Sequence, residues 1–174
     1  MKTNQFTIKK NATLSPAEVE IITAAMQAEP GFTGVDLDEY RSYNPSHNIT
    51  TIRADKELAG LAAHKDFGKN WAEFATLIIL SKFRGQGLGK RLWQETLHQL
   101  SYKNIFVISA NPIVKNRMAL SDNFRQRTFW QLPRTVQGYF IRQKVRWRNV
   151  KELISSRTAP MGEFDFFVKT NHKE

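Results

Sequence analysis

The stretch "TLIILSKFRGQGLGKRLW" (residues 76–93) joins an apolar segment to a glycine-rich turn and then to an amphipathic segment. The apolar part predicts a buried strand, and the leucines spaced at helical intervals after the glycines predict a helix over 88–101. The first amides of a helix have no acceptor within that helix, and glycines let a bulky anion come close to the backbone. Lys90 and Arg91 add positive charge. The stretch therefore predicts a binding site for a pyrophosphate group.

Two common phosphate-binding motifs do not fit this turn. A Walker loop requires the pattern GxxxxGK followed by Ser or Thr. Here only three residues separate Gly85 from Gly89, and Arg91 stands where the hydroxyl residue is required. A dinucleotide fingerprint, GxGxxG, requires glycine at the position that Lys90 occupies. Both motifs are therefore excluded.

The segment "RGQGLG" (84–89) instead resembles the [Q/R]-x-x-G-x-[G/A] motif of the GNAT N-acetyltransferases, which bind acetyl-CoA. The resemblance covers most of the chain in layout and residues 72–112 in motif. It implies that main-chain groups of the turn hold the pyrophosphate of acetyl-CoA, or of a longer acyl-CoA. The cofactor-binding residues predicted in the turn are Arg84, Gly85, Gln86, Gly87, Leu88, Gly89 and Lys90.

The same resemblance implies roles for the strand before the turn and for the strand after the helix. Main-chain groups of Ile79, with Leu77 and Leu80 nearby, would bond the pantetheine arm as an added strand would. The Leu77 amide is also a candidate to polarise the acetyl carbonyl, an oxyanion-type role. Asn111, in "SANP", is a candidate to bond the cofactor arm, and Asn116, in "NRMA", is the second choice.

Acetyl transfer to an amine requires a base that accepts a proton. Glu73 lies eleven residues before Arg84, which is the spacing of the glutamate base in histone-modifying members of the family. Alternation along the strand places Glu73 on the same face as Leu77 and Ile79. Burial at the start of an apolar strand would raise the pKa of this carboxyl group. The alternative is a solvated strand end with no role in catalysis.

Many members of the family carry a tyrosine general acid in a Y-x-x-x-G-F pattern, and this sequence departs from it. The nearest match, "FRQRTF" (124–129), has Phe124 and Thr128 at the tyrosine and glycine positions. Tyr139, expected in a late strand, is the candidate acid. Tyr102, a water molecule or no acid at all are left open, because the coenzyme A thiolate is a fair leaving group.

The rest of the chain predicts alternating strands and helices within a single domain, residues 1–174. Ser15, Pro16 and Glu18 form the start of a capped helix, with Pro16 at its first position. The tryptophans at 71, 93 and 130 are expected in the core. Strands are predicted at 5–10, 49–55, 57–66, 72–80, 104–110, 138–144 and 163–169, and helices at 15–31, 88–101, 114–124 and 146–157.

This order predicts an α/β (α+β) fold, with a mixed sheet and helices on its faces. The resemblance implies a GNAT-type, mostly antiparallel central sheet of about six or seven strands. It also implies helices on both faces and a splayed central strand pair that admits the thioester.

The composition limits the kinds of ligand and partner. The formal charge is +10, from 26 basic and 16 acidic residues, which favours an anionic ligand. The chain has no cysteine, and its four histidines lack metal-ligand spacing, so no metal site is expected. The N-terminus lacks the apolar core of a signal peptide, and no apolar run is as long as a bilayer requires. We therefore expect a soluble, cytoplasmic protein without a membrane partner.

The expected function is an acyl-CoA-dependent N-acyltransferase that transfers an acetyl group to a primary amine by direct attack in a ternary complex. The acceptor would be a small molecule or a peptide, and seven cations with one acid over 134–157 allow an acidic or RNA-linked acceptor. A solvated face is the other explanation of these cations. The alternative function is a non-catalytic module on the same fold that senses acyl-CoA or binds nucleic acid. The sequence leaves the oligomeric state open, with a dimer as one option.

Overall fold

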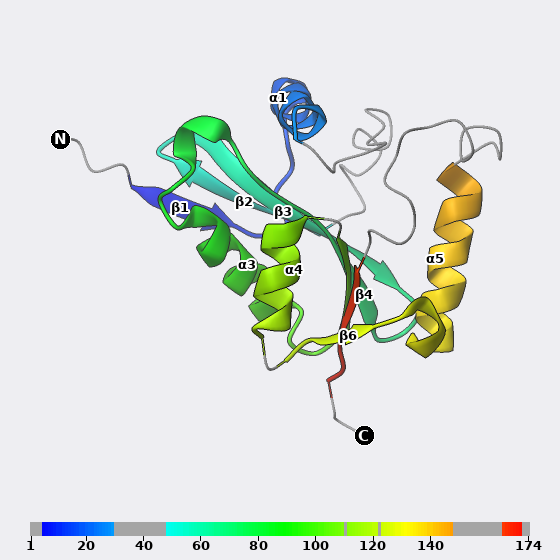
Figure 1. The fold of residues 1–174 in the computed structure, drawn as a ribbon. Coiled ribbons are helices and arrows are strands. Elements are labelled where there is room, and N and C mark those ends of the chain that lie inside the picture. Colours follow the sequence, from blue (N-terminus) through cyan, green and yellow to red (C-terminus); the bar gives the residue numbers. More distant parts are fainter. Residues whose placement is uncertain (1–4, 30–47, 110, 122, 148–164, 172–174) are drawn as a thin grey trace. The chain divides into compact units, whose positions relative to one another are not determined.

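A computed structural model describes residues 5–29, 48–109, 111–121, 123–147 and 165–171 of the chain. From Phe6 to Ala119 the described strands and helices follow one another in the predicted order (Figure 1). The strands are β1 (Phe6–Lys9), β2 (Asn48–Ala54), β3 (Glu57–Phe67), β4 (Trp71–Ile79), β5 (Asn104–Ser109), β6 (Arg125–Arg127) and β7 (Asp165–Lys169). The helices are α1 (Pro16–Gln27), α3 (Leu88–Gln99), α4 (Pro112–Ala119) and α5 (Arg134–Trp147), with single 3₁₀ turns at Ser81–Phe83 and Phe129–Gln131.

The strands form one seven-stranded sheet in the order β1-β2-β3-β4-β5-β7-β6. The β4–β5 pair is parallel, whereas β1–β2, β2–β3, β5–β7 and β6–β7 are antiparallel. The prediction of a mixed, mostly antiparallel sheet is therefore confirmed. In the parallel pair, Trp71 of β4 lies opposite Asn104 of β5, and Glu73 lies opposite Phe106. Both strands continue beyond this last pair.

The chain divides into two compact units. The first unit comprises residues 1–66 and 74–102, and the second comprises 67–73 and 103–174. Strand β4 contributes to both units, and the single domain expected from the sequence stays a prediction. Within the described ranges, no helix is long and apolar enough to cross a bilayer.

The first unit has a helix on each face of its strands. Ile49 of β2 packs in one cluster with Val19 and Ile22 of α1. Its neighbour Thr50 is hydrogen-bonded to α3, with 3.0 Å between Gln99 Nε2 and Thr50 Oγ1. Because successive side chains of a strand point to opposite faces, α1 and α3 cover opposite faces of β2, as can be followed in Figure 1.

The start of α1 carries the capping box that the sequence predicts. The Ser15 hydroxyl oxygen accepts a bond from the Glu18 amide at 3.3 Å, and Glu18 Oε2 accepts one from the Ser15 amide at 2.9 Å. Arg53 of β2 lies 2.6 Å from the same carboxylate. Partial burial acts to raise the pKa of Glu18, but the bonds from Ser15 and Arg53 outweigh it and hold this pKa below its ordinary value.

The substitution Glu18→Gln should lower the free energy of unfolding at pH 7 by about 0.3–1 kcal/mol, because it removes a negative charge from a helix N-terminus. A carboxyl group with a lowered pKa in the folded state contributes stability above its unfolded pKa, and this contribution is lost as the pH falls through the folded pKa. The deficit of the variant should therefore shrink towards pH 3 in urea denaturation. The exposed Glu20→Gln on the same helix serves as control, and an equal deficit of the Glu18 variant at pH 3 and pH 7 would contradict this account.

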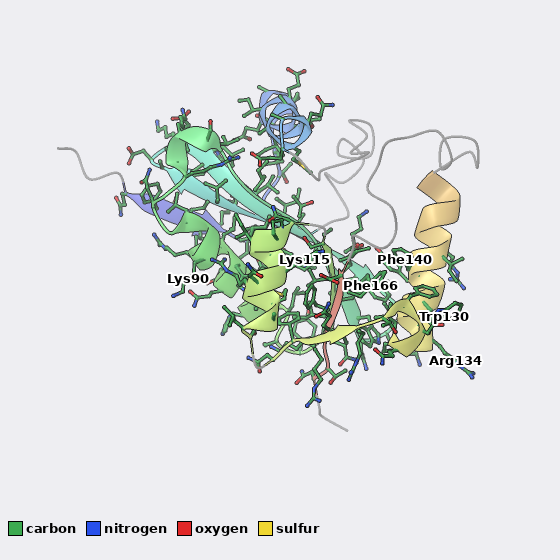
Figure 2. The ribbon with its side chains drawn as sticks, viewed as in Figure 1. Lys90, Lys115, Trp130, Arg134, Phe140 and Phe166 are labelled. Atoms are coloured by element: carbon green, nitrogen blue, oxygen red, sulfur yellow. The ribbon has the colours of Figure 1, made fainter. Side chains whose placement is uncertain are left out.

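The second unit has an aromatic core between α5 and the strands β5 and β7. Phe106 of β5 and Phe166 of β7 lie in this core, and Phe140 of α5 packs against them (Figure 2). The rings of Phe140 and Phe166 meet edge to face, with centroids 5.4 Å apart. Asp165, which faces away from Phe166 along β7, forms a 3.0 Å ion pair with Lys115 of α4. Helices α4 and α5 therefore cover opposite faces of β7.

The strand predicted at 138–144 is wrong, because these residues belong to α5. Aromatic and β-branched residues favour strands locally, and this composition produced the prediction. The decisive contacts have helical spacing instead. Val136, Tyr139 and Phe140 all pack towards the aromatic core. Tyr139 therefore lies on a helix and not in a late strand.

Two further predictions, a helix and a set of core tryptophans, agree with the structure only in part. The helix predicted at 146–157 meets the end of α5 at its first two residues, and the rest lies outside the described residues. The three-residue strand β6 has no pattern that predicts it. Of the three tryptophans expected in the core, Trp93 is buried and Trp71 packs against the core, but Trp130 is 83% exposed. The prediction for Trp130 is therefore wrong.

Candidate active site

The glycine-rich turn places two residues in the left-handed backbone region. Gly85 has φ 78° and Gly87, the N-cap of α3, has φ 72°. A Cβ atom added at either position would meet no other atom within 4 Å. Residues with a side chain rarely adopt this conformation, whereas glycine does so readily. The turn is thus an exposed, open stretch of backbone whose shape requires glycine.

The first amides of α3 follow directly after this turn. The bonds of the helix begin with the amides of Lys90 and Arg91, which donate to the Gly87 carbonyl oxygen at 3.1 and 3.2 Å. The amides of Leu88 and Gly89 come before these donors and have no acceptor one helical turn back. They lie at the positive end of the helix dipole. The described turn therefore offers donors, positive potential and space to an anionic group.

Arg84, the first residue of the motif, holds the turn to the rest of the first unit. Its Nε donates to the Ile79 carbonyl oxygen at 3.0 Å, and its guanidinium group forms an ion pair with Glu29 beyond the end of α1. The Leu80 amide donates to the Ala59 carbonyl oxygen at 2.9 Å. These bonds fix both sides of the junction between β4 and the turn. The Leu80 amide is thereby already used within the protein.

Gly60 of β3 fixes the approach of the two strands at the same place. A Cβ atom at this position would lie 2.5 Å from the Ile78 carbonyl oxygen and 2.6 Å from Ile79 Cδ1. Such distances do not occur, so any side chain here would displace the end of β4. Gly60 was not among the predicted residues, although a glycine inside a strand pattern is a sign of close backbone approach.

Strand β4 has one buried and one half-exposed face. Its residues alternate strictly between partial exposure and burial from Trp71 to Ile79. Glu73, Leu77 and Ile79 lie on the half-exposed face, as the alternation predicts. Glu73 is thus half-buried at the third residue of β4, and its role in catalysis stays a prediction.

The structure brings the two predicted acid–base residues together. The Tyr139 hydroxyl donates to Glu73 Oε2 at 2.6 Å, a short bond to a carboxylate. The Tyr139 ring stacks on Phe67 with 4.0 Å between centroids and 12° between planes. The Trp71 ring also stacks on Phe67, with 6.0 Å between the ring centroids. Phe67 was missed, because nothing in its own neighbourhood of the sequence points to Tyr139.

The two asparagines predicted to bind the cofactor arm both lie at α4. Asn111 is the N-cap, and its side-chain oxygen accepts a 2.9 Å bond from the Ile113 amide. This bond uses the side-chain oxygen and leaves the side-chain N–H donors out. Asn116 lies on the exposed part of the same helix. Asn111 between β5 and α4 thus has a structural role as the N-cap of α4, apart from any ligand.

A comparison with protein families gives this site its context. A sequence profile described as "Acetyltransferase (GNAT) family" matches residues 19–119, more than half of the chain. The chain belongs to the GNAT acetyltransferase family. The predictions of the family and of an acyl-CoA-dependent acyltransferase are therefore confirmed. A comparison with curated proteins gives no match.

Solved structures of other proteins share the fold of this acetyltransferase. N-acetylglutamate synthase from Neisseria gonorrhoeae, complexed with coenzyme A and N-acetyl-glutamate, superposes with a TM-score of 0.63 at 15% identity. The match covers 99% of this chain and 36% of the synthase, so this chain spans about a third of that protein. An acetyltransferase from Bacillus subtilis in complex with coenzyme A gives 0.60 at 14% identity, covering 95% and 99% of the two chains.

A GNAT family acetyltransferase from Elizabethkingia anophelis with acetyl-CoA bound gives a TM-score of 0.58 at 13% identity. The match covers 95% of this chain and 97% of that one. At these identities the similarity shows the fold, and it confirms the predicted GNAT-type architecture. Among the described residues of this acetyltransferase, no three His, Asp or Glu side chains gather as a metal-binding group.

Proposed function

We propose that this acetyltransferase binds acetyl-CoA at the turn between β4 and α3 and transfers the acetyl group to a primary amine. The observation that carries the proposal is the open glycine turn, where Gly85 and Gly87 leave space in front of the first amides of α3. The relatives whose structures contain coenzyme A or acetyl-CoA have the same fold. The diphosphate of the cosubstrate would accept bonds from the turn, and Lys90 would add charge.

The main chain of β4 would hold the pantetheine arm. Ile79 and Leu77 lie on the half-exposed face of this strand. We assign the Leu77 amide to the acetyl carbonyl oxygen, where a donor stabilises the charge that develops during attack. The carbonyl oxygen of Ile79 already accepts one bond from Arg84 and keeps a second lone pair. Asn111 would donate its side-chain amide hydrogens to the same arm.

The chemical step forms a C–N bond between the amine and the acetyl carbon and breaks the C–S bond of the thioester. The attacking amine loses one proton, and the sulfur leaves as a thiolate that takes up a proton. We assign the first proton to Glu73, directly or through water, because a base must accept it within hydrogen-bond reach. Tyr139 donates its proton to Glu73 Oε2 in the described structure. Its first role is therefore to orient this carboxylate, and its hydroxyl is also the candidate acid for the thiolate.

The test is release of free thiol from acetyl-CoA, followed with a thiol reagent, in the presence of a panel of primary amines. The panel contains polyamines, amino acids, a lysine peptide, a peptide with a free N-terminus and an aminoacyl-RNA mimic. We expect amine-dependent thiol release together with an acetylated product identified by mass. Binding of acetyl-CoA without thiol release from any amine would overturn the catalytic proposal and favour an acyl-CoA sensor.

A further inference from the structure

Trp130 is an exposed aromatic side chain of the second unit that the proposed reaction does not use. It lies in the 3₁₀ turn Phe129–Gln131 with 83% of its surface exposed. An indole is among the largest apolar groups in a protein, and leaving it in water forgoes the stabilisation that burial would give. Figure 2 shows Trp130 beside Arg134, near the N-terminal end of α5.

The backbone around Trp130 is held rigidly although the indole itself is exposed. Thr128 and Gln131 form a capping box across the turn. The side-chain amide of Gln137 on α5 donates to the carbonyl oxygens of Trp130 at 3.4 Å and of Leu132 at 2.9 Å. The neighbouring Phe129 ring packs against Phe140 and Phe166 of the aromatic core, with centroids 5.7 and 6.3 Å away. The turn therefore presents the indole outward from a fixed frame, and little conformational freedom remains to be lost on binding.

Positive charge lies on both sides of Trp130 in the sequence. Residues 123–151 contain eight arginines and lysines and no aspartate or glutamate. Arg125 and Arg127 belong to β6, and Arg134 begins α5. Arg125 and Arg134 are exposed, and within the described part of the chain none of these three arginines forms an ion pair with a carboxylate. Their charge is thus available to an anionic partner.

We propose that Trp130 and the arginines Arg125, Arg127 and Arg134 form a binding surface for single-stranded nucleic acid. An unpaired base stacks on the indole, and the guanidinium groups contact the phosphates on either side of it. Surfaces of this kind combine a stacking aromatic with a row of cations, and they tolerate different sequences because every base has a flat face. Arginine suits the contact because its planar fork matches two phosphate oxygens.

Three other kinds of partner fit this surface less well than single-stranded nucleic acid. A duplex keeps its bases stacked inside, so it offers no unpaired base to the exposed indole, which meets the Phe129 ring edge to face with centroids 5.2 Å apart. An acidic peptide would satisfy the arginines but would leave the flat face of Trp130 unused. A membrane would fit an amphipathic helix with several apolar anchors, whereas the described part of this surface has a single large one, with Ile141 further along α5. The proposal concerns a surface of the second unit and does not depend on the assignment of acetyl-CoA.

The test is fluorescence anisotropy with a labelled 20-nucleotide oligo(U), without acetyl-CoA, between 50 and 200 mM salt. We expect Trp130→Ala to weaken binding about 5- to 150-fold, as the loss of one stacked base implies, and Trp130→Phe to retain most of it. Arg134→Gln should reduce the slope of log K against log salt by about 0.7. Tyr102→Ala, another exposed aromatic, and Arg117→Gln, an exposed arginine of α4, are the matched controls and should leave binding unchanged.

Each of three other results would overturn the proposal. Equal binding of oligo(U) and poly-glutamate, with no effect of Trp130→Ala, would show attraction by charge alone. Stronger binding of a double-stranded RNA of the same length would exclude base stacking. Trp130-dependent binding to vesicles of anionic phospholipid, without binding of oligo(U), would assign the surface to a membrane. Circular dichroism of each variant confirms folding, which replacement of an exposed side chain should leave intact.

Discussion

Replacement of Glu73 by glutamine should lower kcat by about 10²–10⁴-fold, the contribution typical of a positioned general base. The amide keeps the shape of the side chain but cannot accept the proton of the attacking amine. Because Glu73 lies on the half-exposed face of β4, the substitution should leave the fold and the affinity for coenzyme A nearly unchanged. Steady-state kinetics with the best amine of the panel, together with a thermal melt, would measure both effects.

Two further variants separate the roles of the groups around Glu73. Tyr139→Phe removes the 2.6 Å bond to the carboxylate and keeps the ring that stacks on Phe67. If Tyr139 orients Glu73, this variant should lower kcat, alter its pH dependence and leave KM for acetyl-CoA unchanged. Phe67→Leu keeps the hydroxyl but loosens the ring, and it should have a smaller effect of the same kind. A Glu73→Gln enzyme with the kcat of the wild type would remove Glu73 from the mechanism.

The second large effect is expected at the glycine turn, where Gly87→Trp should abolish the stabilisation of the protein by coenzyme A. At a ligand concentration of about 100 times Kd, binding adds about 2.7 kcal/mol to the stability of a protein. For a chain of this length, this corresponds to a rise in Tm of about 5–10 °C. The bulky side chain would fill the space in front of the first amides of α3, where a Cβ atom meets nothing within 4 Å.

The control for this experiment is Gly87→Ala. Both variants place a side chain at φ 72° and should lose about 1–2 kcal/mol of stability without ligand. Alanine lacks the bulk of tryptophan, so the variant should keep much of the response to coenzyme A. Gly138→Ala in α5, also free of neighbours within 4 Å, should respond as the wild type does. A full response of Gly87→Trp would place coenzyme A elsewhere on the protein.

The sequence predicts those elements whose periodicity and end signals agree. The capped start of α1 and the passage from β4 through the glycines to α3 are of this kind, and their bounds differ by few residues from the prediction. Helix α5 was mistaken for a strand, because its aromatic residues favour strands locally and the packing that decides the matter involves Phe166, far along the chain. Local preference was overridden by tertiary contacts.

The candidate site likewise combines features that local sequence indicates with contacts that only the fold creates. Gly87 was chosen from the motif at 84–89 and Glu73 from its spacing to Arg84, and their roles stay predictions. Their partners could not be recognised, because the contacts span long separations. Tyr139 reaches Glu73 across 66 residues, and Arg84 reaches Glu29 across 55. The sequence indicated Tyr139 as the candidate acid but placed it in a strand, whereas it lies on helix α5.

The bonds of Arg84 suggest why the first position of the family motif admits either arginine or glutamine. Its Nε meets the main-chain oxygen of Ile79, so the requirement is an N–H donor on a side chain long enough to turn back to the strand end. Glutamine meets that requirement without a charge. In the proposed complex, Arg84 would keep the turn in one conformation before the ligand binds, and the ligand would be spared the entropy of ordering it.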